Sequence, residues 1–265
     1  MWVMITGIRN VDDALRAWSL RANALGLLVK HVDDSTSGFI SPTIATSIAK
    51  RLSRIPKRSP SFRRRDQQEC QNQPLSSPID NGDAFPKPPG RIEGFCECVL
   101  VTHLIDVQKI VNLACTIGVT TIQLVGKNTP EDVSDIKDFL PHIEIIKSIP
   151  VTDDSCMYQV KKYIGVVDAI ELDTIDIATN KFGGTGKTHD WTISQKIVQE
   201  YGHKVPIILA GGLDSGNVKK AIQTVKPFGV DVSSGIKDED SRNIQSGKLV
   251  APFISKAKEC KCERT

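Results

Sequence analysis

Short apolar segments alternate with amphipathic segments along the chain. The apolar segments are rich in Val, Ile and Leu, as strands buried on both faces of a parallel sheet are. The strands are expected at residues 2–6, 24–29, 98–102, 121–124, 144–147, 168–172, 207–210 and 229–232. Eight strands, each followed by a helix, predict an α/β protein with the (β/α)8 fold of a TIM barrel.

Several of the amphipathic segments begin with residues that favour a helix N-terminus. Asn10 precedes one such segment, and Thr129 followed by Pro130 opens another with a proline in its first turn. Asp214 precedes the segment 216–225, and a last helix is expected over 247–258. The helices therefore follow the strands in the order that a barrel requires.

Residues 55–94 depart from this pattern. They contain clustered prolines and three consecutive arginines, with almost no apolar periodicity. This composition is typical of disorder, so the stretch is interpreted as a disordered insert between the second helix and the third strand of a single domain, 1–265. A basic arm that docks a partner or nucleic acid is the alternative, although no aromatic residues are interleaved with the arginines.

Composition narrows the range of partners. The chain has 34 Lys and Arg against 31 Asp and Glu, and this balance does not favour nucleic acid or an anionic membrane as a partner. No apolar run approaches the ~20 residues of a membrane helix, and the seven cysteines are expected to be reduced thiols. We expect a cytoplasmic protein that binds small molecules, as a monomer or a homodimer.

Two glycine-rich segments follow the last two expected strands. Gly211 and Gly212 lie between a strand and a helix, where the backbone can approach an anion near a helix N-terminus. The loops after strands seven and eight are common phosphate sites in TIM barrels. We therefore predict that a phosphorylated small molecule binds here, with a contribution from Gly184 in a further glycine-rich run. The loop after the last strand supplies Ser233, Ser234 and Gly235.

Three ionisable residues are candidates for chemistry at the same end of the barrel. Asp173 follows a strand, where it is either a proton donor or acceptor or a loop-capping residue. His103 lies just beyond the third strand, either as a general base or as a solvent-exposed loop residue. Lys147 ends the fifth strand, where it either binds anions or forms a Schiff base, or only extends its ammonium group to solvent along an apolar stem.

The late motifs resemble those of the phosphoribosylanthranilate isomerase family of the tryptophan pathway. They are LDT at 172–174 with GGTGKTHDW at 183–191, LAGGLDSGNVKKAI at 209–222 and GVDVSSG at 229–235. The likeness covers nearly the whole chain apart from residues 55–94. It implies an Amadori rearrangement of a phosphoribosyl-amine from aldose to ketose, with no metal and no cofactor. It also implies that Asp173 is the acid that opens the sugar ring.

Three positions depart from the family pattern. Thr6 stands where the family has its catalytic cysteine, Gly38 where it has an arginine, and Val125 where it has a histidine. Thr6 is kept as a catalytic candidate, but a hydroxyl cannot act as a base without a partner that takes its proton. The resemblance therefore implies retained phosphosugar binding with a changed base or amine. A non-catalytic phosphosugar-binding barrel and a related phosphosugar enzyme with a different amine substrate remain alternatives.

Overall fold

A computed structural model of the chain describes residues 1–29, 39–54, 97–176, 181–182, 187–237 and 247–260. The predicted insert, residues 55–94, lies outside these ranges, as do Gly38 and Gly184. Within the described part of the chain, no helix has the length and apolar character needed to cross a bilayer.

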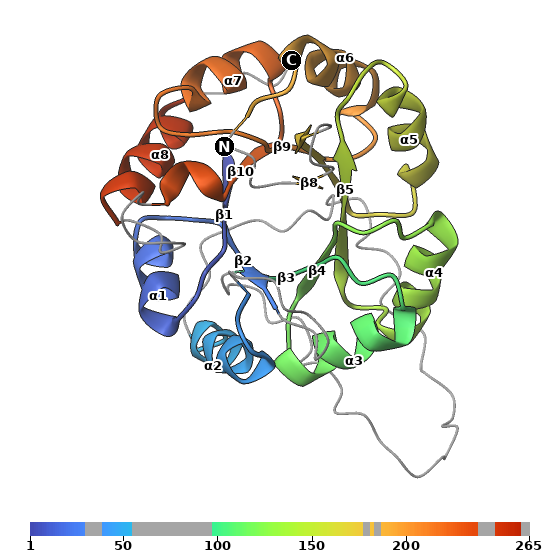
Figure 1. Cartoon of the computed structure of the whole chain (residues 1–265), viewed down its shortest axis with the longest axis vertical. Helices are drawn as coiled ribbons and strands as arrows, with labels where there is room; N and C mark the ends of the chain where they lie inside the picture. The colour runs from blue at the N-terminus through green and yellow to red at the C-terminus, as the bar shows by residue number, and fades with distance from the viewer. Residues whose placement is uncertain (30–38, 55–96, 177–180, 183–186, 238–246, 261–265) are drawn as a thin grey trace, which may run out of the picture.

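The described strands close into the predicted parallel barrel (Figure 1). Around the barrel the neighbours run β1-β10-β9-β6-β5-β4-β3-β2, and β2 pairs with β1 to complete the ring. A short antiparallel pair, β7 with β8, follows β6. The barrel strands are β1 (Trp2–Thr6), β2 (Ala24–Leu28), β3 (Glu97–Thr102), β4 (Thr121–Leu124), β5 (Glu144–Pro150), β6 (Ala169–Asp173), β9 (Ile207–Leu209) and β10 (Gly229–Val232), and the short pair is β7 (Ile175–Asp176) and β8 (Lys181–Phe182).

Helices surround the strands on the outside (Figure 1). Asn10 and Thr129 cap their helices as predicted, by accepting backbone hydrogen bonds from Asp13 and Asp132. The described helices are α1 (Val11–Ser19), α2 (Pro42–Leu52), α3 (Val107–Ile117), α4 (Pro130–Phe139), α5 (Cys156–Tyr163), α6 (Trp191–Tyr201), α7 (Val218–Val225) and α8 (Gly247–Glu259), with a 3-10 turn, η2 (Ser234–Ile236). The predicted α/β fold, a (β/α)8 TIM barrel, is confirmed.

Several boundaries differ from the sequence prediction, and β5 continues to Pro150 instead of ending at Lys147. The helix α7 begins at Val218 rather than near Asp214, because the Asp214 carboxylate accepts the backbone N–H groups of Gly216 and Asn217 and forms a turn first. The strand β6 extends through Asp173, since β5 continues alongside it and the two strands remain paired there. Asp173 is therefore the last residue of a strand.

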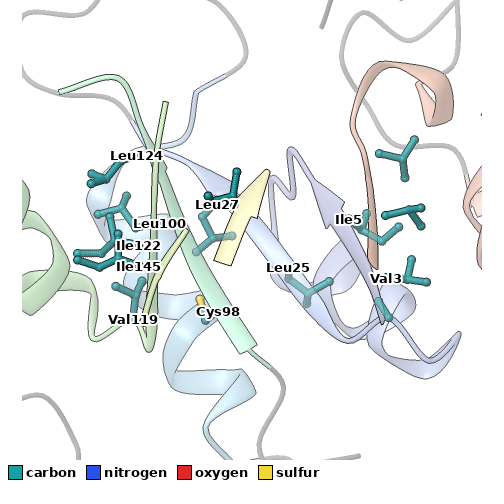
Figure 2. Packing of buried hydrophobic residues seen from close by; sticks show 14 of the residues in the cluster. Val3, Ile5, Leu25, Leu27, Cys98, Leu100, Val119, Ile122, Leu124 and Ile145 are labelled. Carbon is teal, nitrogen blue, oxygen red and sulfur yellow. The ribbon is translucent and has the colours of Figure 1, made fainter. Parts of the chain in front are cut away.

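Hydrophobic side chains form two separate layers. Alternate residues of the strands pack in the cluster between the strands and the helices, for example Val3 and Ile5 of β1, Leu25 and Leu27 of β2, and Leu100 of β3 (Figure 2). The other set gathers inside the barrel, which is why residues of six different strands form one cluster: Trp2, Met4, Ala24, Val99, Val101, Ile146, Ala169 and Ile208. This interior cluster is apolar, and the inward-facing positions nearer the carboxyl ends of the strands hold polar residues.

Candidate active site

Polar side chains from five barrel strands lie near the carboxyl ends of the strands. They are buried or partly buried, and hydrogen bonds or electrostatic contacts join them. The active sites of TIM-barrel enzymes lie at this end of the barrel. The residues are Thr6 of β1, Gln123 of β4, Ser148 of β5, Glu171 and Asp173 of β6, and Asp231 of β10.

Thr6 is hydrogen bonded to a carboxylate. Its hydroxyl lies 2.8 and 2.9 Å from the two carboxylate oxygens of Asp231 and donates to them. Both side chains are buried. The position of the hydroxyl depends on Gly26 of β2, because a Cβ atom there would lie 2.5 Å from the Thr6 oxygen.

Asp231 also shares a hydrogen bond with Glu171. Glu171 accepts hydrogen bonds from the Ser148 hydroxyl at 2.6 Å and from the Gln123 side-chain amide. Burial, and then the Asp231 charge, raise the pKa of Glu171 well above its usual range. Glu171 therefore keeps its proton and donates it to Asp231. Burial raises the pKa of Asp231 as well, but hydrogen bonds from Thr6 and Glu171 oppose this rise and favour the ionised form.

Asp173 lies beside this pair, at the end of β6. Burial raises the pKa of Asp173 to about 8, although its carboxylate accepts the Thr174 backbone N–H at 2.7 Å. Asp173 thus carries a proton at neutral pH. A protonated carboxyl group at the mouth of the barrel can act as a general acid.

The glycines after β9 allow close backbone approaches. Gly211 and Gly212 have positive φ angles of 84° and 61°. A Cβ on Gly211 would lie 2.1 Å from the Thr174 hydroxyl oxygen, and one on Gly212 would lie 2.4 Å from the carbonyl group of Lys187. Both positions therefore require glycine, since any side chain would push this loop away from its neighbours.

The loop after β10 packs against the loop after β9. A Cβ on Gly235 would lie 2.0 Å from the Leu213 carbonyl oxygen, so this glycine holds the two loops together. Ser233, Ser234 and Gly235 are partly exposed. The two segments predicted to bind phosphate therefore form one continuous edge of the barrel mouth.

The other two candidates have different surroundings. His103 is exposed, and its ring lies against the Phe39 ring with centroids 6.5 Å apart. Its role as a base stays a prediction. Lys147 points out of the barrel, where its ammonium group donates to the backbone carbonyls of Leu124, Gly126 and Ser148. The possibility that Lys147 binds substrate anions or forms a Schiff base is therefore contradicted, because inward positions of β5 are occupied by alternate residues such as Ser148.

His189 has a structural position after the glycine-rich run. Its ring nitrogens lie 3.0 Å from the Thr174 hydroxyl and 2.6 Å from the Ser194 hydroxyl. Burial lowers the pKa of His189 to about 4, so the ring is neutral. It links the end of β6 to α6.

Sequence reasoning did not single out Asp231 or Glu171. A signal was present, because Asp231 is an acidic residue in an otherwise apolar strand and Glu171 lies between two apolar residues, Ile170 and Leu172. A buried carboxylate at such a position needs a reason. Asp231 was instead read as part of a phosphate-binding motif.

The class defined by this fold and this polar mouth is the (β/α)8 barrel enzyme. The family model described as N-(5'phosphoribosyl)anthranilate (PRA) isomerase matches residues 91–256. An N-(5'-phosphoribosyl)anthranilate isomerase 2 from Methanosarcina mazei is 36% identical over 260 residues, which cover 97% of this chain and 94% of the relative. The chain belongs to the N-(5'-phosphoribosyl)anthranilate isomerase family.

Solved structures support this assignment. The crystal structure of phosphoribosyl anthranilate isomerase from Thermotoga maritima is 27% identical, with a TM-score of 0.70, and the match covers 98% of this chain and all of the other. Another phosphoribosyl anthranilate isomerase was solved in complex with reduced 1-(o-carboxyphenylamino)-1-deoxyribulose 5-phosphate. It is 25% identical, with a TM-score of 0.67 and coverage of 98% and 100%.

Proposed function

We propose that this protein converts N-(5'-phosphoribosyl)anthranilate into its ketose isomer, in the cytoplasm, as a step of tryptophan biosynthesis. Asp173 carries the proposal, because it is a protonated carboxyl group at the barrel mouth of a chain in this family. No metal or organic cofactor is part of the proposed reaction.

The chemistry needs an acid at the sugar ring. Asp173 donates its proton to the ring oxygen while the amine nitrogen forms a double bond to C1′ and the bond between C1′ and the ring oxygen breaks. The product is an open-chain iminium ion. Loss of the C2′ proton then gives an enaminol, which tautomerises to the ketose. The pKa of Asp173 suits the first step, since the carboxyl group is protonated before reaction.

The phosphate group is proposed to bind at the edge formed by the loops after β9 and β10. Gly211 and Gly212 expose backbone there, and Ser233, Ser234 and Gly235 add hydroxyl and N–H donors. This assignment is supported by the position of the two loops in the barrel. A ligand with a 5-phosphate in the solved relative is consistent with it.

The test combines genetics with kinetics. The chain should restore growth of a tryptophan auxotroph that lacks this isomerase. Purified Asp173→Asn should lose about 10²- to 10⁴-fold in kcat, the usual contribution of a general acid. Asp138→Asn, which changes an exposed carboxylate on α4, is the matched control and should keep full activity. Full activity in Asp173→Asn would refute the assignment of the acid.

Because Thr6 stands where the family has a thiol, the experiment must also test the alternative that this barrel binds phosphosugars without catalysing a reaction. A barrel that only binds phosphosugars would not complement the auxotroph. It would still bind a ribulose 5-phosphate analogue, measured by calorimetry. That combination of results would sink the isomerase proposal.

A further inference from the structure

We propose that Asp231 is the proton acceptor of the reaction and that Thr6 relays the C2′ proton to it. This inference rests on the proposed isomerase function and answers a question which that function leaves open. The step at C2′ needs a base, and the chain has a hydroxyl where the family has a thiol. A hydroxyl becomes a useful proton carrier when a stronger base takes its own proton.

The geometry supplies that partner. The Thr6 oxygen lies within 2.9 Å of both carboxylate oxygens of Asp231, so its hydroxyl proton points into the carboxylate. In the register of the parallel pair, Asp231 is aligned with Met4, and Thr6 lies two residues further toward the mouth. Thr6 thus lies on the mouth side of Asp231. A proton from a ligand in the mouth reaches the buried carboxylate through Thr6.

The relay is held in place by its neighbours. The absence of a side chain at Gly26 gives the Thr6 hydroxyl its space on the β2 side. Glu171 holds Asp231 on the β6 side, and Ser148 and Gln123 in turn hold Glu171. A carboxylate held by hydrogen bonds from two sides is a preorganised proton acceptor.

The charge state of the cluster fits the role. The titratable groups that face Asp231 are the carboxyl groups of Glu171 and Asp173, both on β6. All three carboxyl groups have raised pKa values, that of Asp231 to about 7. Asp231 accepts hydrogen bonds from both Thr6 and Glu171, and these hydrogen bonds favour its ionised form. Asp231 then acts as the base and Asp173 as the acid, and the isomerisation requires one group of each kind.

The proton and electron movements balance. The bond between C2′ and hydrogen breaks, and that proton joins the Thr6 oxygen as the Thr6 proton moves to Asp231. The electron pair of the broken bond forms a double bond between C1′ and C2′, and the electrons of the iminium bond return to nitrogen. In the tautomerisation that follows, C1′ takes a proton from the pair and the hydroxyl at C2′ releases one to water, from which Asp173 recovers the proton that it gave to the ring oxygen. Thr6 and Asp231 are restored, and no alkoxide forms.

The test uses a set of variants at both residues, with kcat and KM measured from pH 5 to 9. Thr6→Val keeps the shape of the side chain but removes the relay, and should lower kcat by about 10²- to 10⁴-fold with little change in KM. Thr6→Ser restores a hydroxyl and should recover activity to within about tenfold of wild type. Asp231→Asn should lose as much activity as Thr6→Val, and the residual activity should no longer fall with decreasing pH.

A double variant separates the proton acceptor from a merely structural residue. Thr6→Cys introduces a thiol that acts as a base itself, so Asp231→Asn should cost much less in the cysteine background than in the threonine background. An equal cost in both backgrounds, with native circular dichroism, would show that Asp231 only supports the fold. Full activity in Thr6→Val would overturn the relay directly.

Two other outcomes have distinct meanings. A wild-type protein without isomerase activity would sink the proposed function, whereas an active wild type with an equally active Asp231→Asn sinks only this inference. If His103→Gln, and not Asp231→Asn, removed the fall of activity at low pH, His103 would be the base and this inference would also be overturned.

Discussion

Asp173, the proposed acid, should weaken the fold at neutral pH. Asp173 has a pKa raised from 3.8 to about 8 in the folded protein. Between these values the unfolded chain releases a proton that the folded chain retains, so the free energy of unfolding falls as pH rises from about 4 to about 8. Asp173→Asn removes this titration, since the amide stays neutral and its oxygen can still accept the Thr174 N–H.

The size of the effect follows from the pKa. One unit in a pKa is worth about 1.4 kcal/mol, so the full displacement gives an upper limit of about 5 to 6 kcal/mol. Asp173 is partly exposed, and solvent screening lowers the expected gain of the variant to about 1 to 2 kcal/mol at pH 8. Near pH 5 the difference between the two proteins should be much smaller, because that pH is only slightly above the pKa of 3.8 in the unfolded chain.

The measurement is urea unfolding of both proteins from pH 5 to 9, followed by tryptophan fluorescence. Asp153→Asn gives a control without pH dependence in this range, because hydrogen bonds from Ser155 lower the pKa of the exposed Asp153 carboxyl group below its usual value of 3.8. Asp153 is then ionised in both the folded and the unfolded chain from pH 5 to 9, so this variant should differ from wild type by a constant amount. A difference between Asp173→Asn and wild type that stays constant across this range would refute the reasoning.

Three further predictions concern the core, the loop and the lysine. Phe253→Ala empties a fully buried position on α8 and should cost about 3 to 5 kcal/mol in urea unfolding; a loss below 1 kcal/mol would contradict the packing. Gly212→Ala should raise KM at least about tenfold, because its Cβ would meet the Lys187 carbonyl. Gly118→Ala, also at positive φ but with open space, should leave KM unchanged. Borohydride reduction with substrate should leave Lys147 unmodified by mass spectrometry, and a trapped adduct would restore the Schiff-base reading.

The order of the elements could be read from the sequence because every barrel strand is buried on both faces. Such strands appear as continuous apolar runs, and the described structure has each of them within a few residues of its predicted position. The same property hides which residues point inward. A continuous run has no alternation to follow, which is why Lys147 was placed at the mouth although it faces the helices.

The position of a candidate residue could be predicted from the sequence where that residue ends a strand. Contacts that depend on which strands pair could not be predicted. Asp173 follows an apolar run, so its position at the mouth could be inferred. The hydrogen bond between Thr6 and Asp231 could not be inferred, because it depends on the pairing of β1 with β10. Nothing in the local sequence of either strand indicates which distant side chain it will meet.

The hydrogen bond between Thr6 and Asp231 joins residues 225 positions apart in the chain. A pair so distant forms only when the first and last strands meet, so isomerase activity would report ring closure during refolding. Helices can form earlier and appear in circular dichroism before any turnover begins. A delay between the two signals would measure how long one edge of β1 stays unpaired before β10 joins it.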